Sequence, residues 1–398
     1  MTIISQTASE APFHAMVKPR GAVCNLDCAY CYFLKKEELF PGSTFRMDSA
    51  TLETFTRNYI AGQPTNTVVF SWHGGEPTLA GMDFFREALK WQEKYARRGM
   101  IIENTIQTNA VLIDSDWAEF FAAHNFLVGV SIDGPAEVHD TYRVDKGGKP
   151  TFSRVVEGIR RLQEAGVTPN FLCALNNASE GQGIRIYEFL RDDLGAKFVQ
   201  FIPVVEPSSD SPGSTVTPWS ISATGYGNFL KEVFEQWYQQ DVGKVFVQMF
   251  EVALASWVGA PKGLCVFEET CGRAIAVEHN GDTFSCDHFV DPEYRLGNVA
   301  FISLQSMVDS AQQKEFGEKK RSSLPTYCQQ CPVLSACNGG CPKDRFILTP
   351  EGEKGLNYLC AGYRDFFLSI DQPLRELSAD LGLEKVALRR REWSSVPS

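Results

Sequence analysis

The first 240 residues alternate short apolar runs with amphipathic stretches. The apolar runs predict six strands, at His14–Lys18, Val68–Trp72, Ile101–Thr108, Leu127–Ile132, Pro169–Ala174 and Phe198–Pro203. The amphipathic stretches predict helices at about Asp48–Ala61, Met82–Arg97, Ser115–His124, Phe152–Ala165 and Ile184–Asp192. Strands that alternate with helices are typical of a parallel α/β sheet with right-handed crossovers. Six strands are too few for an eight-stranded barrel, so the pattern predicts an open or partial barrel.

The pattern changes after this region. Residues 204–222 are rich in Pro, Ser and Thr and predict a loop, and Asn228–Gln239 predicts a helix with an aromatic face. Residues 265–360 contain eight cysteines, many turn residues and little periodicity, as in a module that folds around metals. We therefore expect domains at residues 12–240 and 241–370, followed by a charged terminal helix with a frayed end at residues 371–398.

Composition and charge narrow the possible functions. The chain has 398 residues, of which 43% are hydrophobic, and a net charge of −11, which disfavours general binding to nucleic acid or anionic membranes. No apolar stretch approaches the roughly 20 residues of a membrane span. The N-terminus shows no export signal. Twelve cysteines without such a signal favour metal or redox chemistry in a reducing, cytoplasmic compartment over disulfides.

Three cysteines near the start carry the strongest chemical signal. Cys24, Cys28 and Cys31 form a C-x3-C-x2-C triplet, with Tyr30 before the third cysteine. Three thiolates at this spacing can bind three irons of a [4Fe–4S] cluster and leave the fourth iron open. An open iron allows S-adenosylmethionine to bind the cluster and receive the electron that cleaves it, so the triplet predicts radical chemistry. The alternatives are a three-ligand zinc site or unrelated core cysteines.

Polar and glycine residues follow the predicted strands. Gly74, Gly75 and Glu76 come directly after the second strand, where glycines let the backbone approach a ligand closely. Ser131 ends the fourth strand and Arg143 follows it, and a guanidinium suits a carboxylate bidentately. We expect these residues and Tyr30 to bind S-adenosylmethionine, and we leave Gln107 and Asn109 open. A plain turn, strand-end capping and surface ion pairing are the alternatives.

The remaining cysteines form a distal set. It consists of Cys265, Cys271, Cys286, Cys328, Cys331, Cys337, Cys341 and Cys360. Eight thiolates suffice for two further [4Fe–4S] clusters, which makes three in all, or for two zinc sites. Cys173 is left over, and we interpret it as a buried small hydrophobe. Asp287, directly after Cys286, is a candidate base, with a solvated carboxylate as the alternative.

At this point the chain resembles a known family. The motifs are CNLDCAYCYF, GGEPTLAG, QTNAVLID, FLVGVSIDGPAEVHDTYR, VQFIPVVEP, CDHFVDPEYRLGN, CQQCPVLSACNGGCPKDR and GLNYLCAGY. Over about residues 12–370 they resemble the anaerobic sulfatase-maturating enzymes, which are radical S-adenosylmethionine proteins with a SPASM domain. The resemblance implies an α/β fold: a partial (β/α)6 TIM-like barrel followed by a C-terminal Cys-rich SPASM-type iron–sulfur domain.

The resemblance also implies roles for individual residues. One auxiliary cluster takes Cys265, Cys271, Cys286 and Cys341, and the other takes Cys328, Cys331, Cys337 and Cys360. Asp287 matches the family's general base, and Ser131 and Arg143 match cofactor-binding positions.

The implied reaction oxidises a Cys or Ser side chain of a protein or peptide to formylglycine. It uses a 5′-deoxyadenosyl radical and an external electron donor such as flavodoxin or ferredoxin.

Two positions depart from the family. His73 stands where sulfatase-maturating members carry Gln, and Phe33 stands where a Tyr is found. Both positions face the cofactor and substrate in the family, so they bear on the substrate more than on the radical chemistry. One alternative is therefore a maturase that crosslinks side chains of a ribosomal peptide. A second alternative is an iron–sulfur or zinc scaffold without catalysis.

Overall fold

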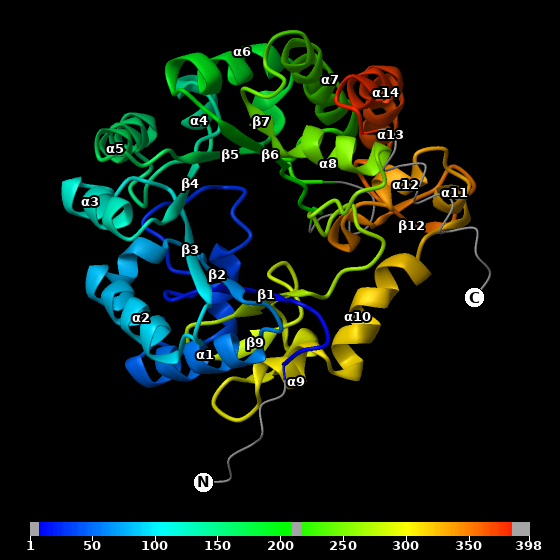
Figure 1. The fold of residues 1–398 in the computed structure, drawn as a ribbon. Helices are drawn as coiled ribbons and strands as arrows, with labels where there is room; N and C mark the ends of the chain where they lie inside the picture. Colours follow the sequence, from blue (N-terminus) through cyan, green and yellow to red (C-terminus); the bar gives the residue numbers. More distant parts are fainter. Residues whose placement is uncertain (1–7, 209–215, 384–398) are drawn as a thin grey trace. The chain divides into compact units, whose positions relative to one another are not determined.

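The computed structural model describes residues 8–208 and 216–383 (Figure 1). They form two compact units, each built from separate stretches of the chain. The first unit holds the described residues up to Ser131, together with Tyr142–Pro169 and Cys271–Glu318. The second holds Ile132–Thr141, the described residues of Asn170–Thr270 and those from Lys319 onward.

A mixed sheet forms the centre of the first unit. Its strand order is β10-β9-β8-β1-β2-β3-β4. The bounds are β1 His14–Val17, β2 Thr67–Trp72, β3 Ile101–Thr108, β4 Leu127–Ser131, β8 Ala274–Val277, β9 Asp282–Phe284 and β10 Arg295–Asn298. Strand β1 pairs in parallel with both β2 and β8, and β2, β3 and β4 continue the parallel ladder. Strand β9 pairs antiparallel with both β8 and β10.

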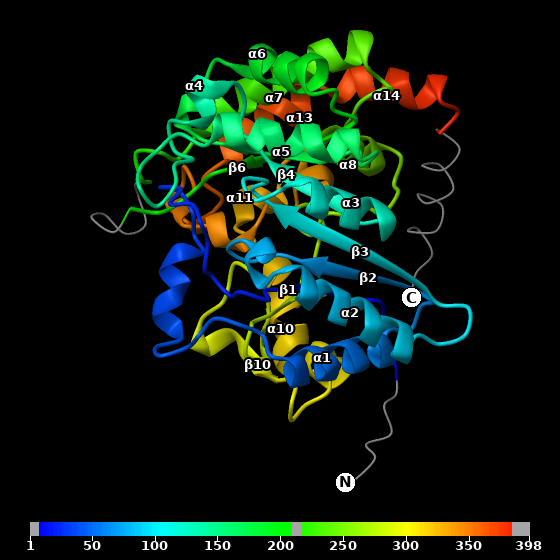
Figure 2. The same cartoon turned by 90° about the vertical axis from the view of Figure 1, so that its left-hand side faces the viewer.

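Crossover helices cover the outer face of these strands, as Figure 2 shows for α1, α2 and α3. Their bounds are α1 Ser49–Gly62, α2 Met82–Tyr95, α3 Ser115–Ala123 and α5 Phe152–Glu164. Asp48 and Asp114 cap α1 and α3 by accepting hydrogen bonds from the backbone N–H three residues later. The core between helices and sheet is aromatic, with Phe55, Phe70 and Phe85 fully buried. Short helix α9, Leu304–Val308, packs against α1, and α10 spans Ala311–Ser322.

The second unit contains three parallel strands and a helical layer. Its strands are β5 Asn170–Leu175, β6 Phe198–Pro203 and β7 Phe246–Val247, in that order. Its longer helices are α7 Ala223–Gln240, α8 Gln248–Trp257, α13 Cys360–Ser369 and α14 Asp371–Asp380. Gly227 and Gly362 let α7 and α13 pack closely, because a Cβ on Gly362 would lie 2.0 Å from the Ala223 carbonyl oxygen.

Short elements complete the second unit. They are α4 Ala136–His139, α6 Gly183–Glu188 with its π-helical continuation Phe189–Asp193, α11 Thr326–Gln329, α12 Leu334–Cys337, β11 Ile347–Leu348 and β12 Lys354–Leu356.

The six strands expected from the sequence are confirmed to within one residue at each end. Helix α7 begins at Ala223, five residues before the expected start. The pattern did not predict β8, β9 and β10, because they have only three or four residues each and lie in a turn-rich stretch. The terminal helix is α14, which the structure places at Asp371–Asp380, and residues 384–398 lie outside the described part of the chain.

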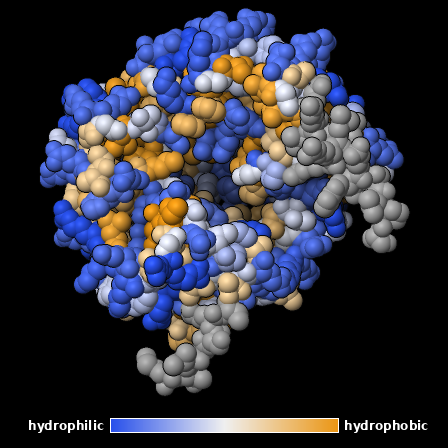
Figure 3. All heavy atoms as spheres, in the orientation of Figure 1, coloured by the Kyte–Doolittle hydropathy of each residue, from blue (hydrophilic) through white to orange (hydrophobic). Residues whose placement is uncertain are grey.

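Polar and apolar residues are interspersed on the face drawn in Figure 3. Within the described ranges, no helix combines the length and the apolar character that crossing a membrane requires.

The aromatic core of the first unit should dominate its stability. Phe70 is fully buried, whereas Phe301 is 82% exposed. We expect Phe70→Ala to lower the free energy of unfolding by about 3–5 kcal/mol because it leaves a cavity. Phe301→Ala, the matched control, should change it by less than about 0.5 kcal/mol. Denaturant titration under anaerobic conditions measures both, and equal effects would contradict this description of the core.

Candidate active site

The carboxyl ends of β1 to β4 lie at one edge of the sheet in the first unit, because the strands are parallel and in register. Lys18 follows β1, His73 follows β2, Asn109 follows β3, and Ser131 ends β4. Ligands of parallel α/β folds bind at this edge. The predicted cysteine triplet lies on the loop after β1, so it belongs to the same edge.

The glycine pair after β2 holds the cysteine loop. Gly75 N–H donates to the Gly21 carbonyl at 2.9 Å, and Glu76 N–H donates to the Val23 carbonyl at 2.9 Å. A Cβ on Gly75 would lie only 2.1 Å from the Val23 carbonyl oxygen. Gly74 has φ +118°, a conformation that favours glycine. Both positions therefore require glycine, because the backbone after β2 packs directly against the backbone of the cysteine loop.

The side chain of Glu76 stabilises the segment after β2 through hydrogen bonds. Its carboxylate is buried and accepts hydrogen bonds from the backbone and hydroxyl of Thr78, from the Thr108 hydroxyl and from Asn109 N–H, at 2.7–3.1 Å. Burial raises the pKa of Glu76. All four hydrogen bonds come from protein groups. Through them the Glu76 carboxylate links the segment after β2 to the end of β3.

The three cysteines of the triplet are free thiols on this loop. Cys31 N–H donates to the Cys28 carbonyl at 2.9 Å, and Leu26 N–H lies 3.4 Å from Cys24 Sγ. The Asn109 amide also approaches Cys24 Sγ, at 3.6 Å. Burial raises the pKa of Cys24 to about 12. A thiolate here would need a compensating positive charge, which the iron of a bound cluster would supply, so these three thiols fit a cluster.

Three further predicted cofactor residues lie in the first unit. The Gln107 amide donates to the Ser131 hydroxyl at 3.0 Å, which holds that hydroxyl at the end of β4. The Arg143 guanidinium lies 5.6 Å from the centre of the Tyr30 ring, in cation–π geometry. Tyr30, one residue before Cys31, thus links Arg143 to the cysteine loop, as expected if both serve one cofactor.

Asp287 lies in a buried cluster of charged side chains. Its Oδ1 pairs with Lys18 Nζ at 2.6 Å, and its Oδ2 accepts a hydrogen bond from the Tyr32 hydroxyl at 2.5 Å. Lys36 Nζ donates to its backbone carbonyl at 2.5 Å. Burial raises the pKa of Asp287, but the ammonium groups of Lys18 and Lys36 outweigh burial and hold that pKa far below its usual range. Burial lowers the pKa of Lys36 to about 8.

The two departures from the family lie beside this cluster. The rings of Phe33 and His73 are 5.6 Å apart, and Lys18 Nζ lies 4.8 Å from the centre of the Phe33 ring. His73 Nδ1 is buried, and no hydrogen-bond partner is present for it among the described residues. Tyr32 also packs against His288, with ring centroids 4.9 Å apart. A tyrosine hydroxyl therefore reaches Asp287 from the position next to Phe33.

Sequence reasoning missed Lys18, Tyr32 and Lys36. The only signal for Lys18 is its place at the end of the first predicted strand, and nothing in the sequence shows that it is buried. Tyr32 lies within the motif CNLDCAYCYF, but the motif does not show that its hydroxyl contacts Asp287, and Lys36, three residues after Phe33, has no distinguishing spacing.

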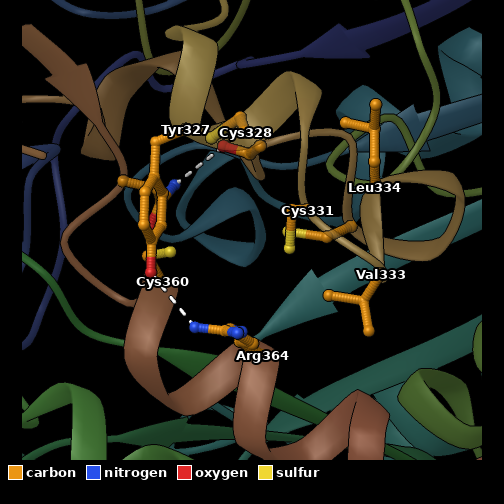
Figure 4. A pocket seen from close by; sticks show the side chains of 10 residues that line it. Tyr327, Cys328, Cys331, Val333, Leu334, Cys360 and Arg364 are labelled. Carbon is orange, nitrogen blue, oxygen red and sulfur yellow. Dashed lines mark hydrogen bonds between the residues drawn. The ribbon is translucent and has the colours of Figure 1, made fainter. Parts of the chain in front are cut away.

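A second thiol cluster lies within the second unit. Cys328, Cys331, Cys337 and Cys360 line one hollow, which Tyr327 and Arg364 also line (Figure 4). Burial raises the pKa of Cys337 to about 12 and that of Cys360 to about 11. The four cysteines expected to hold one auxiliary cluster thus share one hollow.

The other four distal cysteines divide between the units. Cys271 and Cys286 belong to the first, and Cys265 and Cys341 belong to the second. Cys173 is fully buried in β5, where it serves as core. Within the described ranges no three potential ligands converge on a single ion. The thiolates of an iron–sulfur cluster bind different irons and need no such convergence.

Arg345 clasps the loop that carries Cys337 and Cys341. Its guanidinium donates to the carbonyl oxygens of Asn338, Gly339 and Gly340 at 2.8–3.2 Å, and to that of Lys320 at 2.5 Å. A planar fork with five N–H donors suits several carbonyls at once.

Comparison with known families now adds to the geometry. The description "Radical SAM superfamily" matches residues 19–190, and "Iron-sulfur cluster-binding domain" (SPASM) matches residues 265–332. The fold and site therefore define a radical S-adenosylmethionine protein with a partial barrel and a SPASM domain. Proteins of this class need S-adenosylmethionine and a [4Fe–4S] cluster, and SPASM domains bind additional clusters.

Relatives specify the family. The chain is 44% identical to a "Serine-type anaerobic sulfatase-maturating enzyme" of Bacteroides thetaiotaomicron, over 89% of each chain. It is 37% identical to the serine-type enzyme of Klebsiella aerogenes, over 95% of this chain and 90% of that protein. It is 30% identical to a cysteine-type enzyme of Clostridium perfringens, over 89% of this chain and 95% of that protein. The chain belongs to the anaerobic sulfatase-maturating enzymes, which modify peptides by oxidation.

Solved structures agree. "Native anSMEcpe with bound AdoMet and Cp18Cys peptide" superposes with a TM-score of 0.83 at 29% identity, covering 93% of this chain and 99% of that one. "Streptococcus suis SuiB bound to precursor peptide SuiA" gives 0.60 at 17% identity, over 88% of this chain and 76% of that one, and shows a shared fold alone.

A methyl group at Gly75 should prevent assembly of the first cluster. Gly75→Ala places Cβ against two backbone carbonyls of the cysteine loop, which cannot give way as a side chain does. We expect the iron content to fall by one cluster and 5′-deoxyadenosine formation to be lost. Gly147→Ala is the control, because its Cβ would meet only the flexible Asp145 carboxylate, at 3.3 Å. Normal iron content and cofactor cleavage in Gly75→Ala would contradict the assigned role.

Removing the guanidinium of Arg345 should weaken the binding of an auxiliary cluster, because Arg345 holds the loop between Cys337 and Cys341. Arg345→Met leaves several buried carbonyls without donors, at roughly 1–3 kcal/mol for each. We expect iron content to fall by about one cluster, while cofactor cleavage at the first site continues. Arg321→Met is the control, because Arg321 is 60% exposed. Iron analysis together with deoxyadenosine assays distinguishes this outcome from general unfolding.

Proposed function

We propose that this enzyme oxidises a Ser or Cys side chain of a sulfatase-type peptide to Cα-formylglycine. The observation that carries the proposal is the position of Asp287, buried beside the cysteine loop and held by Lys18 and Tyr32. The family membership and the peptide-bound structural neighbour support a peptide substrate. The substrate must lose one hydrogen atom, one proton and one electron to become a carbonyl or thiocarbonyl carbon.

The chain offers residues for each cofactor task. Cys24, Cys28 and Cys31 hold the first [4Fe–4S] cluster, and Tyr30, Ser131, Arg143 and the backbone at Gly74, Gly75 and Glu76 hold S-adenosylmethionine. The eight distal cysteines hold two further clusters, which makes three. When bound, these groups supply the radical that takes hydrogen from the substrate Cβ and the acceptor for the remaining electron. A soluble donor such as flavodoxin or ferredoxin provides the initiating electron.

Asp287 supplies the proton acceptor. Lys18 pairs with Oδ1, and Tyr32, which is about one-third exposed, donates a hydrogen bond to Oδ2. The proton of the substrate hydroxyl or thiol passes to Asp287 as the carbon is oxidised. A Ser substrate gives the aldehyde directly. A Cys substrate gives a thioaldehyde, which water hydrolyses to the same aldehyde with release of hydrogen sulfide.

Serine is the side chain that the relatives favour. The relatives at 44% and 37% identity are both named serine-type, whereas the cysteine-type relative is 30% identical. The crosslinking alternative has no comparable support, since the precursor-peptide protein shares only the fold.

Product analysis tests the proposal directly. Reconstituted enzyme is incubated with reductant, S-adenosylmethionine and paired peptides that carry Ser or Cys in a sulfatase-type sequence. Formylglycine from Cys replaces sulfur by oxygen and removes two hydrogens. Oxidation of Ser removes two hydrogens, as a crosslink does, so a hydrazide probe for aldehyde must accompany the mass measurement. Loss of two hydrogens without hydrazide reactivity would support the crosslink instead.

Changing the proposed base should separate cofactor cleavage from product formation. Asp287→Asn keeps the size of the side chain but removes its basicity, and general-base catalysis is worth about 10²–10⁴-fold. We expect aldehyde formation to fall by that factor while 5′-deoxyadenosine still forms. Chromatographic measurement of both products in one reaction tests this, and unimpaired aldehyde formation would remove Asp287 from its role.

A further inference from the structure

Lys18 is a buried ammonium group held between two buried carboxylates. Its Nζ lies 2.9 Å from Glu278 Oε1 and 2.6 Å from Asp287 Oδ1, and its side chain is 1% exposed. Glu278 has no part in the proposed chemistry, yet it is as buried as Lys18. An arrangement of three buried charges costs desolvation energy and is weak evidence for stability, so its value to the protein needs another explanation.

The lysine is fixed by the sheet. Strands β1 and β8 pair in parallel, and Lys18 N–H continues that ladder by donating to the Val277 carbonyl at 2.9 Å. Glu278 follows Val277 directly, and its own N–H donates to the Asp282 carbonyl at 2.8 Å. Lys18 and Glu278 therefore leave neighbouring strand ends side by side. A group anchored on two rigid strands can hold a third group with little freedom.

Asp287, in contrast, lies on a loop after β9. Phe289 N–H donates to the Cys286 carbonyl at 3.1 Å, which places Asp287 in a turn. The side chain of a loop residue keeps one orientation only if a partner holds it. Lys18 holds Oδ1, Lys36 holds the backbone carbonyl, and Tyr32 meets Oδ2.

We propose that Lys18, anchored by Glu278, is a positioning residue that fixes Asp287 through Oδ1 and so presents Oδ2 to the peptide substrate. This inference rests on the proposed function, because it assumes that Asp287 accepts the substrate proton. Lys18 acts after hydrogen abstraction, since removing a hydrogen atom requires no carboxylate. Loss of Lys18 therefore uncouples cofactor cleavage from product, while the peptide still binds.

Three variants test this role. Lys18→Met removes the ammonium group and keeps the apolar stem, and Lys18→Arg restores a cation. The double variant Lys18→Met/Glu278→Met also removes the Glu278 carboxylate. It therefore distinguishes a role of Lys18 in positioning Asp287 from a role in neutralising Glu278. Lys94→Met is the matched control, since Lys94 pairs with Glu53 on the exposed surface at 2.8 Å. Each protein is compared for iron content, deoxyadenosine, aldehyde, and KM for the peptide.

The expected result is a change in coupling, by which we mean the amount of aldehyde formed for each deoxyadenosine released. Relative to wild type and Lys94→Met, Lys18→Met should raise the ratio of deoxyadenosine to aldehyde about 10- to 100-fold, the scale of losing a residue that orients a functional group. KM for the peptide should stay within about threefold, and iron content should be unchanged. Lys18→Arg should restore part of the coupling, and the double variant should remain uncoupled.

Other outcomes overturn the inference. An unchanged ratio in Lys18→Met with full iron content, or wild-type coupling in the double variant, would show that Lys18 only balances Glu278. Loss of iron in all three variants, Lys18→Arg included, would make Lys18 structural. Failure of the proposed function is separate, because it appears as absence of aldehyde from wild-type enzyme or as unimpaired coupling in Asp287→Asn.

Discussion

The parallel pairing of β1 with β8 is the constraint on which the site depends. It joins residues 14–17 to residues 274–277, which are far apart in the chain, within one sheet. The cysteine loop leaves β1 and the Asp287 loop follows β8 and β9, so this ladder brings a cluster site and a proposed base into one unit. The parallel strands β1 to β4 alone would place the cysteine loop, Gly75, Glu76 and Ser131 at this edge, but they would not bring Asp287 to it.

Burial determines the electrostatics around that ladder. In the cysteine loop, burial raises the pKa of the Cys24 thiol, so a thiolate there would need the positive charge of bound iron. The opposite balance holds at Asp287, where neighbouring ammonium groups outweigh burial. One region thus favours neutral thiols without metal, and the adjacent region keeps a carboxylate charged.

The two departures from the family acquire a physical meaning in this setting. Phe33 packs under the Lys18 ammonium, and Tyr32, the next residue, supplies the hydroxyl that reaches Asp287. His73 lies against Phe33 with its Nδ1 buried. Both residues lie beside the proposed base, and the backbone of Phe33 also contacts the Cys31 thiol.

The sequence by itself determined the radical chemistry and most of the barrel. The triplet Cys24, Cys28 and Cys31 is local, as are the strands β1 to β6, because their spacing and alternation are set by neighbouring residues. The resemblance already grouped the four cysteines of the hollow, and only the tertiary structure revealed β8–β10 and the partners of Asp287. Those features depend on pairing between distant segments and on burial, and the burial of Lys18 leaves no trace in the order of residues. The sequence pattern therefore predicts the radical chemistry, and the fold determines which side chains surround Asp287.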